Sequence, residues 1–315
     1  MKSDVKNTLY SKKHCVRTYF TKNIEFWILC LPAIVYFIIF HYWPMFGSVL
    51  AFKDFSYTKG ILGSDWVGFE NFRFFFQSND AWRITRNTLG YSTIFIITGT
   101  IASMTVALLL FEVRQRVCIK TYQTIMILPH FMSWVIVGYI TYILFNDEKG
   151  VMNQIITYFG GDSIAWYSTP KVWPFILPII NIWKTVGMNS IMYYAALMGV
   201  DSSIYEAATI DGANRWKQIL SISIPLLVPM MTILTIMSVG NIFRGDFGLF
   251  YQITRDIGAL YPTTDIIDTY VYRGLRTGDV GITAAVGLFQ SLVGLVVVIF
   301  TNYVVKKIEP DNALF

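Results

Sequence analysis

The chain has 315 residues, of which 54% are hydrophobic, 17% aromatic and only 14% charged. Soluble proteins carry charge on about a quarter of their residues, so this composition excludes intrinsic disorder and argues against soluble domains. The formal net charge of +5 is modest, and we do not expect nucleic acid as a partner.

Six uncharged stretches of at least 25 residues follow one another along the chain, the fourth interrupted only by Lys184. A membrane-spanning helix needs roughly 20 apolar residues, so each stretch can cross a bilayer. Buried helices of a soluble protein are the alternative, and six in one chain of this length argue against it. We predict an all-α membrane protein with six transmembrane helices, at about 26–50, 88–111, 122–145, 173–198, 222–243 and 281–304.

The charges of the connecting segments predict the orientation. Segments on the side of the N-terminus carry 13 Lys and Arg residues, against 11 in the longer segments on the other side. Because cytoplasmic loops are enriched in these residues, we place both termini in the cytoplasm. Residues 1–25 then form a cytoplasmic segment, too long for the head of a cleaved signal peptide. The transmembrane domain covers 26–305, and 306–315 is a cytoplasmic tail.

Polar side chains inside the predicted spans mark a candidate solute pathway. Lys184 lies near the middle of the fourth span, where a charge costs on the order of 3 kcal/mol on insertion scales. Such a residue should face the protein interior or water. Lys184 has a structural alternative, because its ammonium could bond helix-end carbonyls or extend to the bilayer surface. The candidate pathway residues are Asn181, Lys184, Asn189, Tyr193 and Gln290.

The segment between the fourth and fifth spans predicts two short helices on the membrane surface. Ser203 and Glu206 have capping-box spacing, which starts a helix. Gly212 follows Asp211 and ends that helix, because glycine readily takes a left-handed conformation. A second helical stretch over Ala213–Ile222 leads into the fifth span, and Pro225 marks its junction with the membrane part.

This segment resembles the EAA loop of the permeases of binding-protein-dependent ABC importers. The resemblance rests on Glu206-Ala207-Ala208, on Gly212 and on Ile222-x-x-Pro225, and it extends along nearly the whole chain. Further matches are Trp66–Phe72, Leu128-Pro129 and Gly150–Asn153. Trp43–Gly47, Ala51–Lys53 and the terminal Ala313–Phe315 are similar to the oligosaccharide and polysaccharide subgroup.

The resemblance implies a type I importer fold in a bacterial plasma membrane. The chain would supply half of the pathway for an oligosaccharide and would pair with a second, homologous permease. A cytoplasmic ATPase dimer would bind ATP and Mg, and an extracellular solute-binding lipoprotein would deliver the sugar. If Lys184 faces the pathway, its positive charge favours an acidic sugar as the substrate. By position, the surface that couples the chain to the ATPase would consist of Glu206, Ala207, Ala208, Asp211, Gly212 and Ala213.

Missing motifs bear on the competing functions. The sequence has no Gly-Lys dipeptide and therefore no phosphate-binding loop, and it has no His-Glu-x-x-His or Cys-x-x-Cys. We therefore expect no metal, cofactor or catalytic residue in this chain. An ion-coupled secondary carrier usually has carboxylates within its spans, and the six stretches contain none. A membrane-embedded enzyme would need a cluster of His, Asp and Glu, whereas the outer acids Asp265 and Asp268 have no histidine near them in sequence.

Overall fold

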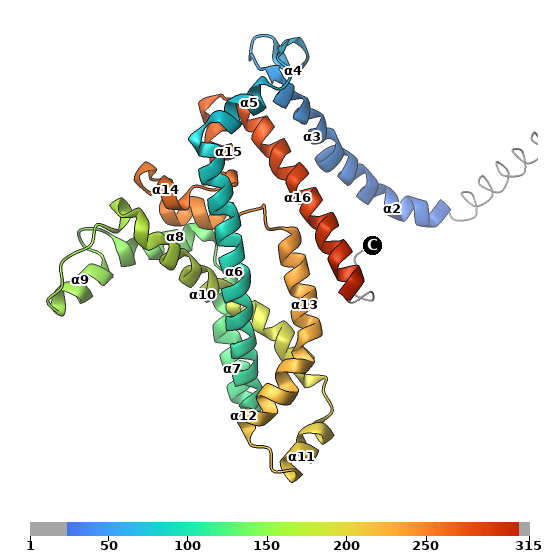
Figure 1. The fold of residues 1–315 in the computed structure, drawn as a ribbon, viewed down its shortest axis with the longest axis vertical. Helices are drawn as coiled ribbons and strands as arrows, with labels where there is room; N and C mark the ends of the chain where they lie inside the picture. Colours follow the sequence, from blue (N-terminus) through green and yellow to red (C-terminus); the bar gives the residue numbers. More distant parts are fainter. Residues whose placement is uncertain (1–23, 309–315) are drawn as a thin grey trace, which may run out of the picture.

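The computed structural model describes residues 24–308, which are almost entirely helical (Figure 1). Most of the predicted segment 1–25 and of the predicted tail 306–315, together with the terminal Ala313–Phe315 motif, lies outside the described residues. The strands are β1 (Lys53–Asp54) and β2 (Asp65–Trp66), which pair antiparallel with Lys53 opposite Trp66. Five helical segments are long and apolar enough to cross a membrane, and a sixth is a bent pair.

The first span runs over Ile24–Phe52 and consists of α2 (Ile24–Phe37), η1 (Ile38–Tyr42), α3 (Trp43–Met45) and η2 (Phe46–Phe52). It leans away from the other helices in Figure 1 and contacts α16 through η2. Its most apolar window is 0% buried, so the other residues of 24–308 do not cover this span. After the hairpin come α4 (Gly60–Gly63) and α5 (Glu70–Gln77).

The second span is α6 (Asn79–Glu112), a continuous helix of 34 residues that packs along α10. It begins nine residues before the predicted position 88 (79 against 88). We predicted that the helix begins after the last charged residue of the loop, but Arg83 and Arg86 lie within the helix, and their guanidinium groups have polar partners nearby. Arg83 pairs with Asp80 one turn earlier, at 2.9 Å, and Arg86 donates to the carbonyl of Pro262 at 2.9 Å.

The third apolar stretch is broken, and our prediction of one helix over 122–145 is wrong. The chain forms α7 (Arg116–Ile127) and a short η3 (Leu128–Phe131), then turns by 96° into α8 (Trp134–Phe145). Pro129 lacks the N–H that would continue the hydrogen-bond ladder. The side chain of Ser133 then accepts from the N–H of Ile136, which starts a new helix at the bend.

The remaining elements complete the bundle. After α8 the chain forms α9 (Val151–Tyr158), η4 (Trp166–Ser168), η5 (Pro170–Val172) and the fourth span α10 (Trp173–Met198), whose bounds are those we predicted. The fifth span covers Arg215–Gly240 and the sixth is α16 (Val280–Ile308). Between them lie η7 (Leu249–Ile253), η8 (Gly258–Leu260), α14 (Tyr261–Thr264) and α15 (Ile267–Thr277).

Three buried clusters hold the elements together. The largest surrounds Trp173 and Leu177 of α10 and includes Phe250 of η7. A second joins α6, α15 and α16, and a third joins α6, α10 and α13 (Ile224–Gly240) through Ala107, Tyr193 and Leu227. In lipid, small residues such as Ala107 allow helices to approach closely.

Candidate functional site

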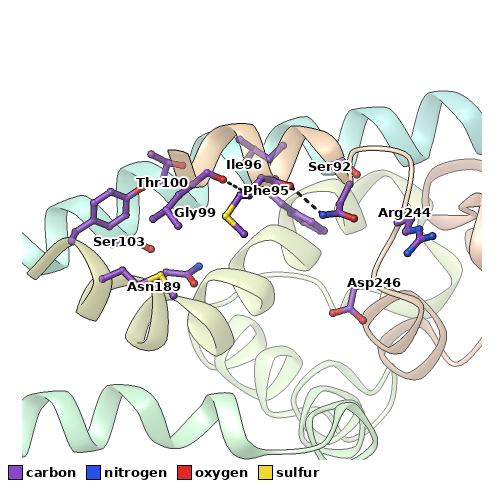
Figure 2. Close-up of a pocket in the computed structure, with 15 residues that line it drawn as sticks. Ser92, Phe95, Ile96, Gly99, Thr100, Ser103, Asn189, Arg244 and Asp246 are labelled. Carbon is purple, nitrogen blue, oxygen red and sulfur yellow. Dashed lines mark hydrogen bonds between the residues drawn. The ribbon is translucent and has the colours of Figure 1, made fainter. Parts of the chain in front are cut away.

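A cavity of about 490 Å³ lies between α6, α10 and the end of α13 (Figure 2). Its wall combines apolar groups with hydroxyl, amide and charged groups, the mixture that binding sites for polar organic molecules require. Two of the predicted pathway residues, Asn189 and Tyr193, line it. The other polar lining residues are Ser92, Thr100, Ser103, Ser238, Asn241, Arg244 and Asp246.

The cavity exists because α13 is short. It ends at Gly240, about halfway along α6 in Figure 1, and the chain then turns away toward η7. The turn leaves open space beside α6 and places Asn241, Arg244 and Asp246 at its edge. On the α6 side the hydroxyl of Ser103 is buried and has no hydrogen-bond partner among residues 24–308, so a bound molecule can supply one.

The turn after α13 is held from behind. The amide nitrogen Nε2 of Gln290 donates to the carbonyl of Phe243 at 2.7 Å, and it lies 3.3 and 3.4 Å from the two carboxylate oxygens of Asp268. That carboxylate also accepts from the N–H of Gly245 at 2.8 Å. Burial raises the pKa of Asp268 above its ordinary value. Gln290 does not line the cavity; it fixes the backbone that does.

Lys184 lies in the bend of the third span, outside the cavity. Its ammonium donates to the carbonyls of Met132 at 2.7 Å, His130 at 2.8 Å and, more weakly, Pro129 at 3.4 Å. It also lies 4.9 Å from the ring centroid of Trp134. The residue is 7% exposed, so the structure favours the alternative in which Lys184 bonds helix-end carbonyls.

Asn181, three residues before Lys184, is half-buried on α10 and does not line the cavity either. Of the five predicted pathway residues, the fold therefore brings only Asn189 and Tyr193 together. Arg244 and Asp246 also line the cavity but were not among the predicted residues, although both follow directly after the predicted fifth span over 222–243. Two opposite charges directly after a predicted span were the available signal.

The predicted coupling loop contains α11 (Ser202–Ile210), but its start differs from our prediction. Asp201, not Ser203, caps the helix: its carboxylate accepts from the N–H of Ser203 at 3.0 Å, and this bond lowers the pKa of Asp201. Because Ser203 lies inside the helix, it cannot form a capping box with Glu206.

The end of α11 follows the prediction. Gly212 has φ +77°, and the N–H of Ala213 reaches back to the carbonyl of Ala208 at 2.9 Å, the bonding of a left-handed helix end. Glu206, Ala207, Asp211 and Gly212 are exposed, whereas Ala208 and Ala213 are half-buried. A short stretch of chain thus presents the six predicted coupling residues on a fixed turn.

The predicted second stretch, Ala213–Ile222, begins later and does not end at the membrane junction. Asn214 caps it by accepting from the N–H of Lys217 at 2.9 Å, and α12 (Arg215–Gln218), η6 (Ile219–Ser223) and α13 then form one span. η6 is a wide turn that ends two residues before Pro225, which cannot donate to the ladder.

Side chains bind α11 to the bundle. The ring of Tyr205 packs against Phe111 at the end of α6, with centroids 5.5 Å apart, and its hydroxyl lies 3.0 Å from the hydroxyl of Ser223. The amide of Gln218 donates to Thr209 at 2.9 Å. α11 is therefore tied by side-chain contacts to the end of α6 and to the first part of the fifth span.

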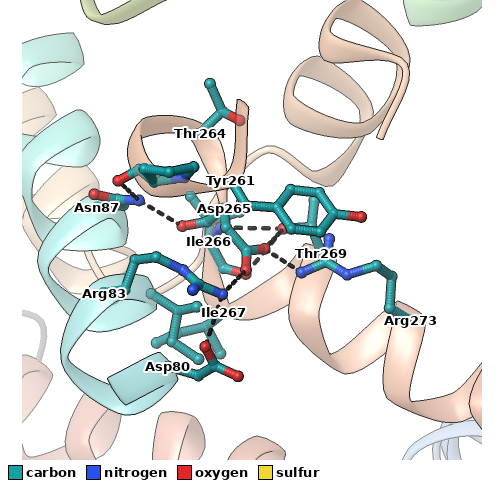
Figure 3. A network of polar contacts seen from close by, with 12 residues as sticks. Asp80, Arg83, Asn87, Tyr261, Thr264, Asp265, Ile266, Ile267, Thr269 and Arg273 are labelled. Carbon is teal, nitrogen blue, oxygen red and sulfur yellow. Dashed lines mark hydrogen bonds and ion pairs between the residues drawn. The ribbon is translucent and has the colours of Figure 1, made fainter. Parts of the chain in front are cut away.

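At the opposite end of α6, a buried carboxylate joins it to α15 (Figure 3). The side chain of Asp265 is 0% exposed and lies 3.0 Å from Arg83 and 2.5 Å from Arg273. Asn87 donates to the backbone carbonyl of Asp265 at 2.9 Å, and Thr269 donates to its carboxylate at the same distance. The charge of Asp265 is thus fully paired, which is how buried carboxylates are tolerated.

Within residues 24–308, no group of three or more His, Cys, Asp or Glu side chains is arranged to hold a metal ion. The buried acids Asp265 and Asp268 are engaged with arginines, a threonine, an amide and the backbone.

Comparison with known proteins identifies the class. Residues 96–310 match the family described as binding-protein-dependent transport system inner membrane component. Protein LplB of Bacillus subtilis (strain 168) is 37% identical over 91% of this chain and 90% of its own length. The polygalacturonan/rhamnogalacturonan transport system permease protein YteP of the same organism is 35% identical over 91% and 89%.

A solved structure shows the same fold. A chain of a bacterial ABC transporter involved in the import of the acidic polysaccharide alginate superimposes with a TM-score of 0.85 and 33% identity, covering 93% of this chain and 99% of that one. This match confirms the predicted type I importer fold and rules against the ion-coupled carrier. The chain therefore belongs to the family of binding-protein-dependent transport system inner membrane components, as a multi-pass permease subunit of an ABC importer.

Proposed function

We propose that the chain forms one half of the translocation pathway for an oligosaccharide or glycan fragment, and that the cavity beside the end of α13 is its substrate-facing surface. The observation that carries the proposal is the lining of this cavity, where Asn189, Asn241 and several hydroxyls can bond sugar hydroxyls. The similarity of the chain to YteP and to the alginate transporter supports a glycan as the substrate.

Energy would come from a separate ATPase dimer that binds ATP and Mg. The exposed face of α11 and its turn, including Glu206 and Gly212, would fit into a cleft of that ATPase. Two features support this role: the turn is rigid, and Tyr205 joins α11 to the inner end of α6. Closing of the ATPase dimer would then reorient the bundle as rigid bodies, which is alternating access driven from a partner.

The remaining components follow from the same assignment. A second homologous permease would complete the pathway and would cover the exposed first span. An extracellular solute-binding lipoprotein would deliver the sugar; a solved relative is described in complex with an alginate pentasaccharide-bound periplasmic protein. Because α11 must face the ATPase, both termini would lie in the cytoplasm, as the loop charges predict.

The coupling role is tested with the double variant Glu206→Lys, Gly212→Asp. We expect it to insert into membranes but to lose its ATPase subunits on purification. The matched control is Glu148→Lys with Gly160→Asp on the predicted outer side, since Gly160 also has a positive φ and open space around it. Co-purification of the ATPase with the α11 variant at the level of the control would refute the coupling role.

The transport role is tested in proteoliposomes that contain the complete importer and its binding protein. Uptake of labelled oligosaccharides should require ATP on the side of the vesicle membrane that the ATPase faces. An ion gradient alone should not drive uptake. Uptake driven by a proton or sodium gradient without ATP would contradict the proposal.

A further inference from the structure

The cavity beside α13 contains an arginine with no ion-pair partner. Among residues 24–308, no carboxylate lies within 4.0 Å of the guanidinium of Arg244, and that guanidinium makes no hydrogen bond. The other three arginines of 244–279 are engaged. Arg273 pairs with Asp265, Arg255 stacks over Tyr142, and Arg276 stacks over Tyr272.

The backbone on both sides of Arg244 is fixed. Gln290 bonds the carbonyl of Phe243 and Asp268 accepts from the N–H of Gly245, so the residues immediately before and after Arg244 each have a tertiary hydrogen bond. A Cβ at Gly245 would come within 2.3 Å of Ile266, so the turn is also closely packed. The backbone that carries Arg244 is therefore pre-organised, which limits the entropy lost on binding a ligand to that of the side chain itself.

The surroundings of Arg244 match a ligand that carries both an anion and hydroxyl groups. Asp246 stands beside it at the same end of the cavity in Figure 2, but one of its carboxylate oxygens accepts from the N–H of Leu249 at 3.1 Å. The other oxygen remains able to accept from a sugar hydroxyl. Toward the other end lie Asn189 and Thr100, which can bond hydroxyls as donors or acceptors.

From this arrangement we infer that the imported sugar is acidic, and that Arg244 selects it by binding the carboxylate of a uronic acid residue. This inference rests on the proposed function and adds the substrate class. A guanidinium binds a carboxylate through two parallel hydrogen bonds, a geometry that a lysine ammonium cannot reproduce. Gln290 and Asp268 act as positioning residues, since they hold the turn and do not line the cavity. Lys184, buried in the bend, takes no part in charge selection.

The test compares tri- and tetragalacturonate with their carboxyl-reduced, neutral counterparts. The complete importer is reconstituted with its binding protein, and the ratio of acidic to neutral initial uptake rates is measured. We expect Arg244→Gln to lower this ratio at least ~10-fold, the size of effect that loss of a charged hydrogen bond produces. Arg244→Lys should lower it less. Arg276→Gln is the matched control, because Arg276 is also exposed in the same segment but does not line the cavity.

A second measurement separates the permease from its binding protein. Saturation-transfer NMR on the permease and ATPase complex in nanodiscs, without binding protein, should show trigalacturonate contacts that Arg244→Gln removes. If Arg244→Gln still imports neutral sugars and leaves the ratio of acidic to neutral uptake rates unchanged, the inference is overturned while the importer function stands. Failure of the wild-type complex to import any sugar of either kind would overturn both.

Discussion

The ammonium of Lys184 replaces backbone donors that the bend of the third span has lost. We therefore predict that Lys184→Met destabilises the permease. The two shorter bonds, to Met132 and His130, are 2.7 and 2.8 Å long. Hydrogen bonds to charged groups contribute about 1.5–3 kcal/mol each, which gives about 3–6 kcal/mol for the pair. Removing a buried charge recovers part of this, so we expect a net loss of about 2–3 kcal/mol.

Thermal unfolding in nanodiscs measures this loss. At about 2–4 °C per kcal/mol for chains of 150–250 residues, the Tm should fall by about 4–12 °C. Lys171→Met, at an exposed lysine just before α10, is the control and should leave the Tm unchanged. Spin labels at the exposed Tyr122 and Tyr139, one on each side of the bend, should report a broader distance distribution in Lys184→Met. A variant with the wild-type Tm and an unchanged distance distribution would show that the ammonium does not hold the bend.

Two further predictions concern close packing and pH. Gly187→Ala should impair folding, because a Cβ there would lie 1.9 Å from the carbonyl oxygen of Met126. Gly287→Ala is the control and should fold normally, because nothing lies within 4 Å of a Cβ at that position. Equal yields of folded protein from the two variants would contradict the packing argument. Burial raises the pKa of Asp268, so the folded chain binds a proton there at higher pH than the unfolded chain, and stability from this group falls as pH rises through that window. Asp268→Asn removes this dependence. The Tm of the variant minus the Tm of the wild type should therefore be larger at pH 7 than at pH 4.5. A Tm difference that is the same at both pH values would refute the assignment.

The spans were predictable where hydrophobicity alone decides the structure. The fourth span begins and ends where the sequence placed it, at Trp173 and Met198, and Lys184 is the only charged residue within it. The bend in the third span was not predicted, since the hydropathy of a stretch reports only how apolar it is and not whether its helix is straight or bent. Pro129 and Ser133 were its visible signals, but a proline within a span can also be accommodated without a break, as Pro178 is in α10.

The candidate site was predicted only in part, because side-chain partners are set by tertiary structure. Asn189 and Tyr193 are four residues apart on one helix, a spacing that places them on a common face. Gln290 and Lys184 have polar partners on other elements, which no local pattern reveals. The position of Arg244 directly after the fifth span can be read from the sequence, but only the tertiary structure shows that its guanidinium has no ion-pair partner among residues 24–308.

The length of α6 has a mechanical consequence. At 1.5 Å per residue, its 34 residues form an uninterrupted rod of about 50 Å. One tip of this rod touches Tyr205 on α11, and the opposite tip carries Arg83 into the carboxylate of Asp265. A tilt of about 5° around the first tip displaces the second by about 4 Å over that length. If α11 couples to an ATPase as proposed, a helix of this length would convert a small rotation at one membrane face into a displacement of several ångströms at the other.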